Sequence, residues 1–74
     1  MKVERVTFHF TPGCEPRALS GVANVTFSEG QAFSDLHYIV REGMHVVNYI
    51  NPITSKREGT SFPVTNVEQV NTTL

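Results

Sequence analysis

Residues Leu36 to Asn51, LHYIVREGMHVVNYIN, contain two apolar runs separated by a short polar gap. β-Branched and aromatic residues, which favour strands, dominate both runs, Leu36–Val40 and Met44–Ile50. The gap is Arg41-Glu42-Gly43, and a glycine in so short a gap is typical of a tight turn that requires positive φ. The stretch therefore predicts a β-hairpin in the middle of a sheet, apolar on both faces and covered on at least one.

Two more strands are expected before the hairpin. Val3–Phe10 alternates apolar and polar residues, which is typical of a half-buried strand. Thr11–Pro16 has two prolines and a glycine and predicts a loop. Arg17–Ser28 alternates again and predicts a second strand. The third strand is expected over Ala32–Arg41 and includes the first apolar run, and the fourth over Met44–Asn51.

The residues after the hairpin predict a short strand and a helix. Pro52 removes a backbone donor and should end the fourth strand. Lys56–Gly59 is typical of a loop tip, and Thr60–Phe62 predicts a short fifth strand. Thr65–Glu68 has the pattern of a capping box, so a helix is expected from there to Leu74, lying on the sheet. The expected fold class is α+β, with an antiparallel β-sheet of four to five strands and one short C-terminal helix.

Size and charge limit the classes of function. We expect the 74 residues to form one domain, residues 1–74. Six basic against seven acidic residues give a net charge of −1. Tight nonspecific binding to nucleic acid relies on an excess of basic residues, and this chain has no such excess. No apolar run is long enough to span a membrane, and Glu4 and Arg5 stand where a signal peptide needs apolar residues. A cytoplasmic protein with a reduced Cys14 thiol is therefore expected.

Metal binding and catalysis are not expected. His37 and His45 flank the hairpin turn and would meet across the strands, but a closed zinc site needs four ligands. Cys14 has no histidine placed beside it to act as a base, and Asp35, Glu42 and Glu58 show no spacing for shared acid–base work. We expect no cofactor, no metal site and no enzyme activity. We interpret the histidines as surface or cross-strand residues and the carboxylates as solvated charges.

Several short motifs, in the same order along the chain, resemble the SpoVG family (stage V sporulation protein G, also called septation protein). They include an alanine-containing second strand, an apolar third strand, a glycine-led fourth strand, a basic loop and a proline entry into a terminal helix. The segments that carry the resemblance are Ala18–Phe27, Phe33–Val40, Gly43–Val47, the loop residues Pro52, Lys56, Arg57 and Gly59, and Phe62–Thr65. Relative to the family, the segment after Pro52 is short and the basic C-terminal tail is missing.

The resemblance implies a single SpoVG-like domain, a strongly bent antiparallel sheet with one helix, a dimer, and a regulator that binds DNA or RNA. The candidate nucleic-acid contacts are the basic residues Arg17, Arg41, Lys56 and Arg57, doubled by the dimer. The alternative is an inhibitor or accessory module of phage or mobile-element origin, for example an anti-CRISPR protein, which acts by protein–protein contact. A short, near-neutral chain without enzyme motifs suits that role.

The residues also predict a homodimer built through a strand edge. A chain this short has a small core, and its single cysteine excludes an internal disulfide, so a second copy would add stability. The candidate edges are Val3–Phe10 and Met44–Asn51, and we favour the second of these or the segment after Pro52. Val47 and Tyr49 are the candidate interface residues.

Overall fold

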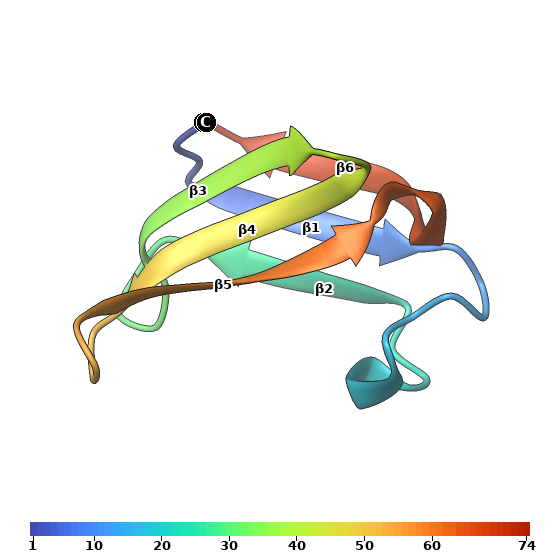
Figure 1. Ribbon diagram of the computed structural model, residues 1–74, viewed down its shortest axis with the longest axis horizontal. Helices are drawn as coiled ribbons and strands as arrows, with labels where there is room; N and C mark the ends of the chain where they lie inside the picture. Colours follow the sequence, from blue (N-terminus) through green and yellow to red (C-terminus); the bar gives the residue numbers. More distant parts are fainter.

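The computed structural model describes all of residues 1–74 and shows an all-β protein with two short 3₁₀ turns (Figure 1). The elements, in chain order, are β1 Arg5–Phe10, η1 Arg17–Leu19, β2 Asn24–Ser28, β3 Ser34–Arg41, β4 Met44–Asn51, β5 Lys56–Pro63, η2 Val64–Asn66 and β6 Val67–Thr73. The strands form two three-stranded antiparallel sheets, ordered β2-β1-β6 and β3-β4-β5. The expected α+β fold, one antiparallel sheet of four to five strands with a C-terminal helix, was therefore wrong, since six strands form two sheets and there is no α-helix.

The predicted hairpin is present as β3 and β4, but it does not lie in the middle of the sheet, because β3 is an edge strand. Tyr38 lies opposite Val47 and Arg41 opposite Met44, so the two strands pair directly up to the turn. Glu42 and Gly43 both have positive φ, 53° and 76°, as a tight hairpin turn that matches the right-handed strand twist requires. β4 ends at Asn51, before Pro52, as predicted.

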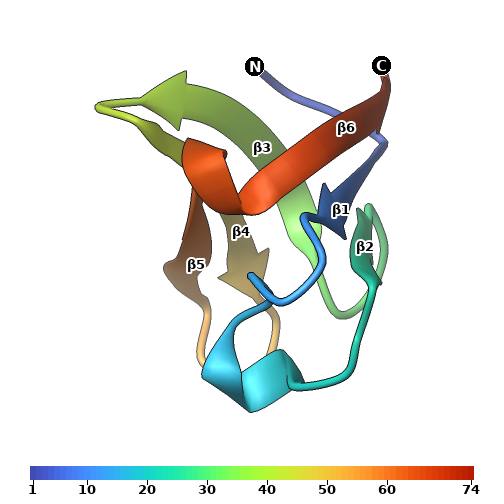
Figure 2. The same ribbon diagram turned by 90° about the vertical axis from the view of Figure 1, so that its right-hand side faces the viewer.

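The N-terminal residues link the two sheets. The Val3 N–H donates to the Leu36 carbonyl at 3.1 Å, and the Tyr38 N–H donates to the Met1 carbonyl at 2.8 Å, so Met1–Val3 runs along part of β3. One residue later the Glu4 N–H donates to the Thr73 carbonyl of β6 at 2.7 Å. The chain therefore crosses from one sheet to the other between Val3 and Glu4, and both termini lie at this end of the molecule (Figure 2).

The core lies between the sheets and is small and aromatic. Nine hydrophobic residues are buried: Val3, Val6, Phe8, Phe10, Phe27, Leu36, Tyr38, Val47 and Phe62. The Phe8 ring is fully buried and lies near the rings of Phe27 in its own sheet and of Tyr38 and Phe62 in the other, with centroids 5.2 to 6.2 Å apart. Phe8 therefore joins the two sheets.

The C-terminal helix predicted from Thr65 is instead strand β6. Val67–Thr73 pairs antiparallel with β1, with Val70 opposite Phe8. The Thr65 hydroxyl donates to the Asn66 side chain at 3.3 Å and caps nothing, and only the 3₁₀ turn η2 forms before the strand begins. Pairing with β1 supplies partners for backbone groups along this segment, and its valines and threonines favour extended backbone.

Two further boundaries differ from the sequence expectation. The expected strand Arg17–Ser28 is a strand only from Asn24, because the 3₁₀ turn η1 and Gly21, with φ 81°, occupy its first half. The expected loop tip Lys56–Gly59 is the first half of β5, which pairs with β4 over eight consecutive residue pairs. The actual turn between β4 and β5 is residues 52–55, where Ser55 has φ 57°.

The strands expected to form free edges are central strands. β1 lies between β2 and β6, and β4 lies between β3 and β5. The predictions that Val3–Phe10 or Met44–Asn51 forms an edge were therefore wrong. They failed because β6 pairs with β1, and because β5 begins four residues earlier than expected and covers β4 along its full length. The segment after Pro52, the remaining candidate, is an edge strand.

Candidate functional site

Alternation along β3, β4 and β5 separates an inward row of side chains from an outward row. Leu36, Tyr38, Val47 and Phe62 are buried between the sheets, so their sequence neighbours face outward. We call this outward surface the hairpin face. Its residues are His37, Ile39 and Arg41 of β3, Met44, Val46, Asn48 and Ile50 of β4, and Arg57, Gly59 and Ser61 of β5.

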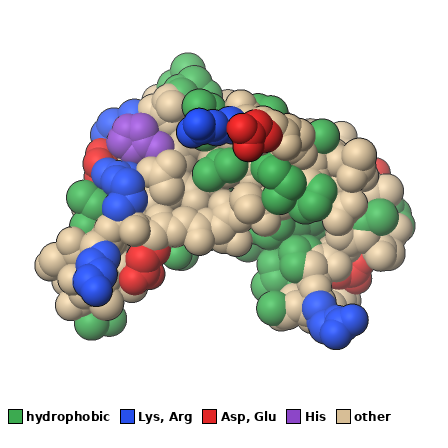
Figure 3. Space-filling model, viewed as in Figure 1, with side chains coloured by type: hydrophobic (Ala, Val, Ile, Leu, Met, Phe, Trp, Pro, Cys, Tyr) green, Lys and Arg blue, Asp and Glu red, His purple; other side chains and the backbone are tan.

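The centre of the hairpin face is apolar. Ile39 lies directly opposite Val46 in the β3–β4 register, and Met44 and Ile50 follow on the same side of β4. Ile39 is 47% exposed, and Met44, Val46 and Ile50 are half-buried. Figure 3 shows hydrophobic side chains gathered in the middle of this surface, with basic, acidic and histidine side chains around them. Apolar groups grouped inside a polar rim are typical of protein-contact surfaces.

The outward surface of the other sheet, which we call the polar face, has no such patch. Its three β1 residues, Arg5, Thr7 and His9, lie opposite polar residues on both sides. These neighbours are Ser28, Thr26 and Asn24 on β2, and Thr73, Asn71 and Gln69 on β6. The Thr7 and Thr26 hydroxyls are 2.8 Å apart. The polar face is therefore a solvated surface, as expected for one side of an antiparallel sheet.

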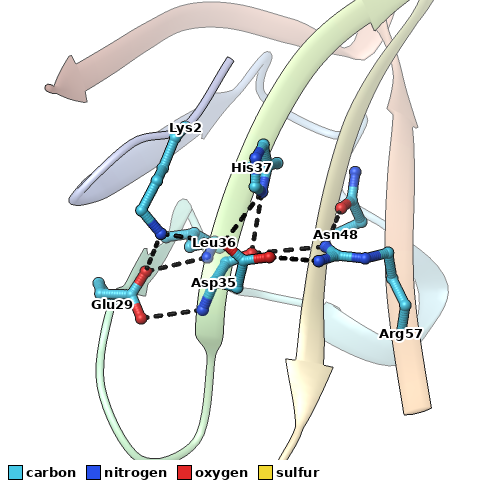
Figure 4. Close-up of polar contacts among 7 residues, drawn as sticks. All are labelled: Lys2, Glu29, Asp35, Leu36, His37, Asn48 and Arg57. Carbon is cyan, nitrogen blue, oxygen red and sulfur yellow. Dashed lines mark hydrogen bonds and ion pairs between the residues drawn. The ribbon is translucent and has the colours of Figure 1, made fainter.

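A network of charged side chains borders the hairpin face (Figure 4). The Lys2 ammonium lies 3.0 Å from the Asp35 carboxylate and 3.3 Å from that of Glu29. The Arg57 guanidinium crosses β4 to pair with Asp35, and it also donates to the Asn48 side-chain oxygen at 2.6 Å. The network thus connects the N-terminal segment, the β2–β3 turn, β3 and β5.

The same contacts shift the pKa values of three members. Hydrogen bonds from Lys2 and then Arg57 lower the pKa of the Asp35 carboxyl, and the bond to Asp35 raises the pKa of Lys2. The pKa of Glu29 is lowered chiefly because its carboxylate accepts the backbone N–H of Leu36, and also that of Asp35, each at 2.9 Å. Because these groups are charged and exposed, the network positions chain segments with little effect on stability.

Asp35 itself has unusual backbone geometry. Its φ is 54°, in the left-handed region, and the β3–β4 register shifts between Ser34 and His37. This bulge places the Asp35 carboxylate between Lys2 and Arg57. The sequence interpretation treated Asp35 as a solvated charge and missed the network, because its members are far apart in the chain. A carboxylate at the start of an otherwise apolar strand was the one available signal.

The four basic residues expected to contact nucleic acid do not form one patch. Arg41 pairs in register with Met44 and Lys56 with Asn51, which puts them at opposite ends of the sheet, roughly 23 Å apart at the usual strand rise. Arg17 lies on η1, at the other end of the molecule from the β4–β5 turn next to Lys56 (Figure 1). Only Lys56 and Arg57 are neighbours, and Arg57 is paired with Asp35.

The two residues expected at a dimer interface face the core side of β4. Val47 is fully buried within its own chain, so its assignment to an interface was wrong. The Tyr49 ring is half-buried and packs edge-on against Phe33, with centroids 4.8 Å apart. Both residues have an intramolecular role because β4 is the central strand of its sheet.

The structure separates the histidines. His37 faces outward, whereas His45 faces inward, where its Nδ1 lies 2.8 Å from the Tyr38 hydroxyl. Burial lowers the pKa of His45 and raises that of Tyr38. His9 is on the polar face, 3.2 Å from the Asn71 amide. No group of three or more histidine, cysteine or acidic residues is placed to hold a metal ion.

No protein-family model, curated protein or solved structure matches the chain. The resemblance to the SpoVG family therefore stays a prediction, and the terminal helix that it implied is absent. No helix of the structure has the length and apolar character needed to cross a bilayer.

Proposed function

We propose that this protein is a binding module, without enzyme activity, that acts by protein–protein contact through the hairpin face. One observation supports this most strongly: the cross-strand pair Ile39 and Val46, with Met44 next to it on β4, forms an apolar centre in which Ile39 is 47% exposed. Burying such a centre against a partner removes apolar area from water and so favours association.

The charged rim would orient the partner. Asp35 and Arg57 are already paired with each other, so a partner meets them as a fixed dipolar feature. Arg41 lies at the far end of the same face and has no acidic partner within ion-pair distance, so it is available to a carboxylate on the partner. Complementary charges of this kind increase the association rate and the specificity more than the affinity.

A cytoplasmic inhibitor or accessory module of phage or mobile-element origin, for example an anti-CRISPR protein, is the role that we propose for this surface. Such a module needs a stable scaffold and one contact face, and it does not need a catalytic site. The second proposal, a SpoVG-like regulator that binds DNA or RNA, has less support because the four candidate basic residues do not converge.

A pair of matched double variants tests the proposal. Ile39→Lys with Val46→Glu places an opposite-charge cross-strand pair at the centre of the hairpin face. Thr7→Lys with Thr26→Glu places the same pair at the equivalent position of the polar face. Each variant and the unmodified protein would be used to capture partners from the source cell, after circular dichroism has confirmed that all three are folded.

We expect the unmodified protein and the polar-face variant to capture the same partner proteins. The hairpin-face variant should fail to capture them. The same retained set for all three baits, or no retained protein, would refute the proposal. A gel shift with DNA and RNA at increasing salt tests the second proposal, because phosphate binding must weaken as salt rises. Salt-sensitive binding that survives the hairpin-face change would favour the nucleic-acid regulator.

A further inference from the structure

The outer edge of β5 has unpaired backbone groups along most of its length. The Val64 N–H donates to the Gly43 carbonyl at 2.9 Å, and this bond fixes the alternation of the β4–β5 ladder. By that alternation Lys56, Glu58, Thr60 and Phe62 bond to β4. The residues between them, Arg57, Gly59 and Ser61, direct their N–H and C=O groups away from the sheet.

The centre of this edge lacks the features that usually protect an edge strand, although Lys56 and Pro63 lie at its two ends. β5 contains no bulge against β4, and seven of its eight residues are exposed. By contrast, the edge of β3 is partly covered by Met1–Val3. Of the charges on β5, Arg57 is drawn across the sheet to Asp35 and away from the edge (Figure 4). The centre, Gly59-Thr60-Ser61, is small and uncharged. A strand edge that is open at its centre in this way can pair with another strand.

We infer that the occupant of this edge is a second copy of the chain, with the two β5 strands antiparallel across a two-fold axis near Gly59. This inference is independent of the proposed protein-binding function. The arrangement joins two β3-β4-β5 sheets into one continuous sheet, and it gives a partner to every free N–H and C=O of Arg57, Gly59 and Ser61.

The side chains of β5 are compatible with self-pairing. With the axis at Gly59, Arg57 lies opposite Ser61 of the second copy, and Glu58 lies opposite Thr60. No like charges are then directly opposed, which would otherwise destabilise the pairing. The glycines meet at the axis without side chains, so the backbones approach freely.

An exposed apolar residue supports the same arrangement. Ile53, in the turn before β5, is 91% exposed, the highest value among the large hydrophobic residues. In the antiparallel dimer this turn lies beside the start of η2 in the other copy, which places Ile53 near Val64. The contact occurs twice because the axis is two-fold. It adds apolar area at both ends of an interface that is otherwise made of backbone hydrogen bonds.

Solution mass and residue-resolved amide exchange test the dimer. Light scattering at micromolar concentration should give twice the 8.3 kDa mass of one chain. As the protein concentration rises, the amides of Arg57, Gly59 and Ser61 should become protected from exchange. Those of Asn24, Thr26 and Ser28, which by the same alternation lie on the free edge of β2, should not change.

A proline substitution provides the matched variant. Ser61→Pro removes an N–H that faces away from β4, so the ladder within the chain is kept while the edge is blocked. Asn24→Pro makes the same change on the edge of β2. We expect Ser61→Pro to be monomeric and Asn24→Pro to remain dimeric. The exchange measurement uses the unmodified chain, so the inference stays testable if either variant fails to fold.

Three results would overturn the inference. The first is a monomer mass for the unmodified protein across the micromolar range. The second is a dimer whose concentration-dependent protection appears on β2 or β6 and not on β5. The third is protection of the β5 amides only after a captured partner protein is added to a monomeric chain, which would assign the edge to that partner.

Discussion

The hairpin face and the polar face belong to sheets of the same size that share one core, yet their chemistry differs. Every cross-strand neighbour on the polar face is polar, whereas the hairpin face has Ile39 opposite Val46 at its centre. Folding requires apolar residues on the inner side of each sheet and sets no such requirement on the outer side. The polar face shows that this chain can have a solvated outer surface, so the apolar centre of the hairpin face is a feature available for function.

The largest expected effect on stability is in the core that the two sheets share. Phe8→Ala removes the ring that contacts Phe27, Tyr38 and Phe62 and should cost about 3–5 kcal/mol of unfolding free energy. Ile39→Ala, on the hairpin face, should change it by no more than about 0.5 kcal/mol. Urea melts of both variants measure the difference. Equal losses would mean that Ile39 belongs to the folding core and would remove the contrast between inner and outer sides.

A smaller effect is expected at Gly59, where β5 approaches β4 closely. A Cβ atom there would lie 2.5 Å from the Val47 carbonyl oxygen, so Gly59→Ala must displace the backbone, at a cost of about 1–3 kcal/mol. Gly30 has open space around it and no positive φ, so Gly30→Ala should be neutral or slightly stabilising. Denaturant melts measure the unfolding free energy of both variants. Equal changes for Gly59→Ala and Gly30→Ala would contradict the close approach of β5 to β4.

The third prediction concerns pH and the inner side of the hairpin. Burial holds the pKa of His45 below its ordinary value of 6.5, so the folded state resists protonation more than the unfolded state does. The stability from neutral His45 is complete above pH 6.5 and is lost as pH falls through the folded pKa. The melting temperature should fall as the pH is lowered from 7.5 to 5. In the His45→Gln variant the melting temperature should depend less on pH. This range lies above 4.5, the ordinary pKa of Glu29. An unchanged slope in His45→Gln would exclude His45 as the cause.

The smallest expected effect is at the rim of the hairpin face. Asp35 and Glu42 both have positive φ, which asparagine tolerates well. Asp35→Asn should lower the melting temperature slightly, because Lys2 and Arg57 lose their shared partner, and added salt should reduce the difference from the unmodified protein. Glu42→Asn creates an Asn-Gly turn, which suits the hairpin, and should raise the melting temperature. A gain for both variants would show that the network does not contribute to stability.

Local chemistry was enough to predict the hairpin but not the C-terminal segment. β3 and β4 are adjacent in sequence, and Glu42-Gly43 specifies their turn, so all the information lies within sixteen residues. β6 pairs with β1, from the far end of the chain, and the capping-box pattern at Thr65 gave no warning of this. The helix signal failed because non-local strand pairing outweighs the weak helix preference of a short segment.

The candidate site was predictable only in part. Its apolar residues belong to the hairpin runs, so their presence in a sheet followed from the sequence. Which side faced outward depended on the second sheet, which covers Tyr38 and Val47 and leaves Ile39 exposed. The ion network needed Lys2, Asp35 and Arg57 to meet from three segments, and no spacing in the sequence indicates that meeting.

The pairing of β1 with β6 has a consequence for the order of events in folding. β3, β4 and β5 are successive hairpins, so their sheet needs only short loops to close. β1 needs β6, and Arg5 is opposite Thr73, so the second sheet closes a loop of nearly the whole chain. Such long-range pairing is slow. During synthesis on a ribosome, one flank of β1 would stay unpaired until β6 emerges, which leaves its backbone N–H and C=O groups open to off-pathway strand pairing.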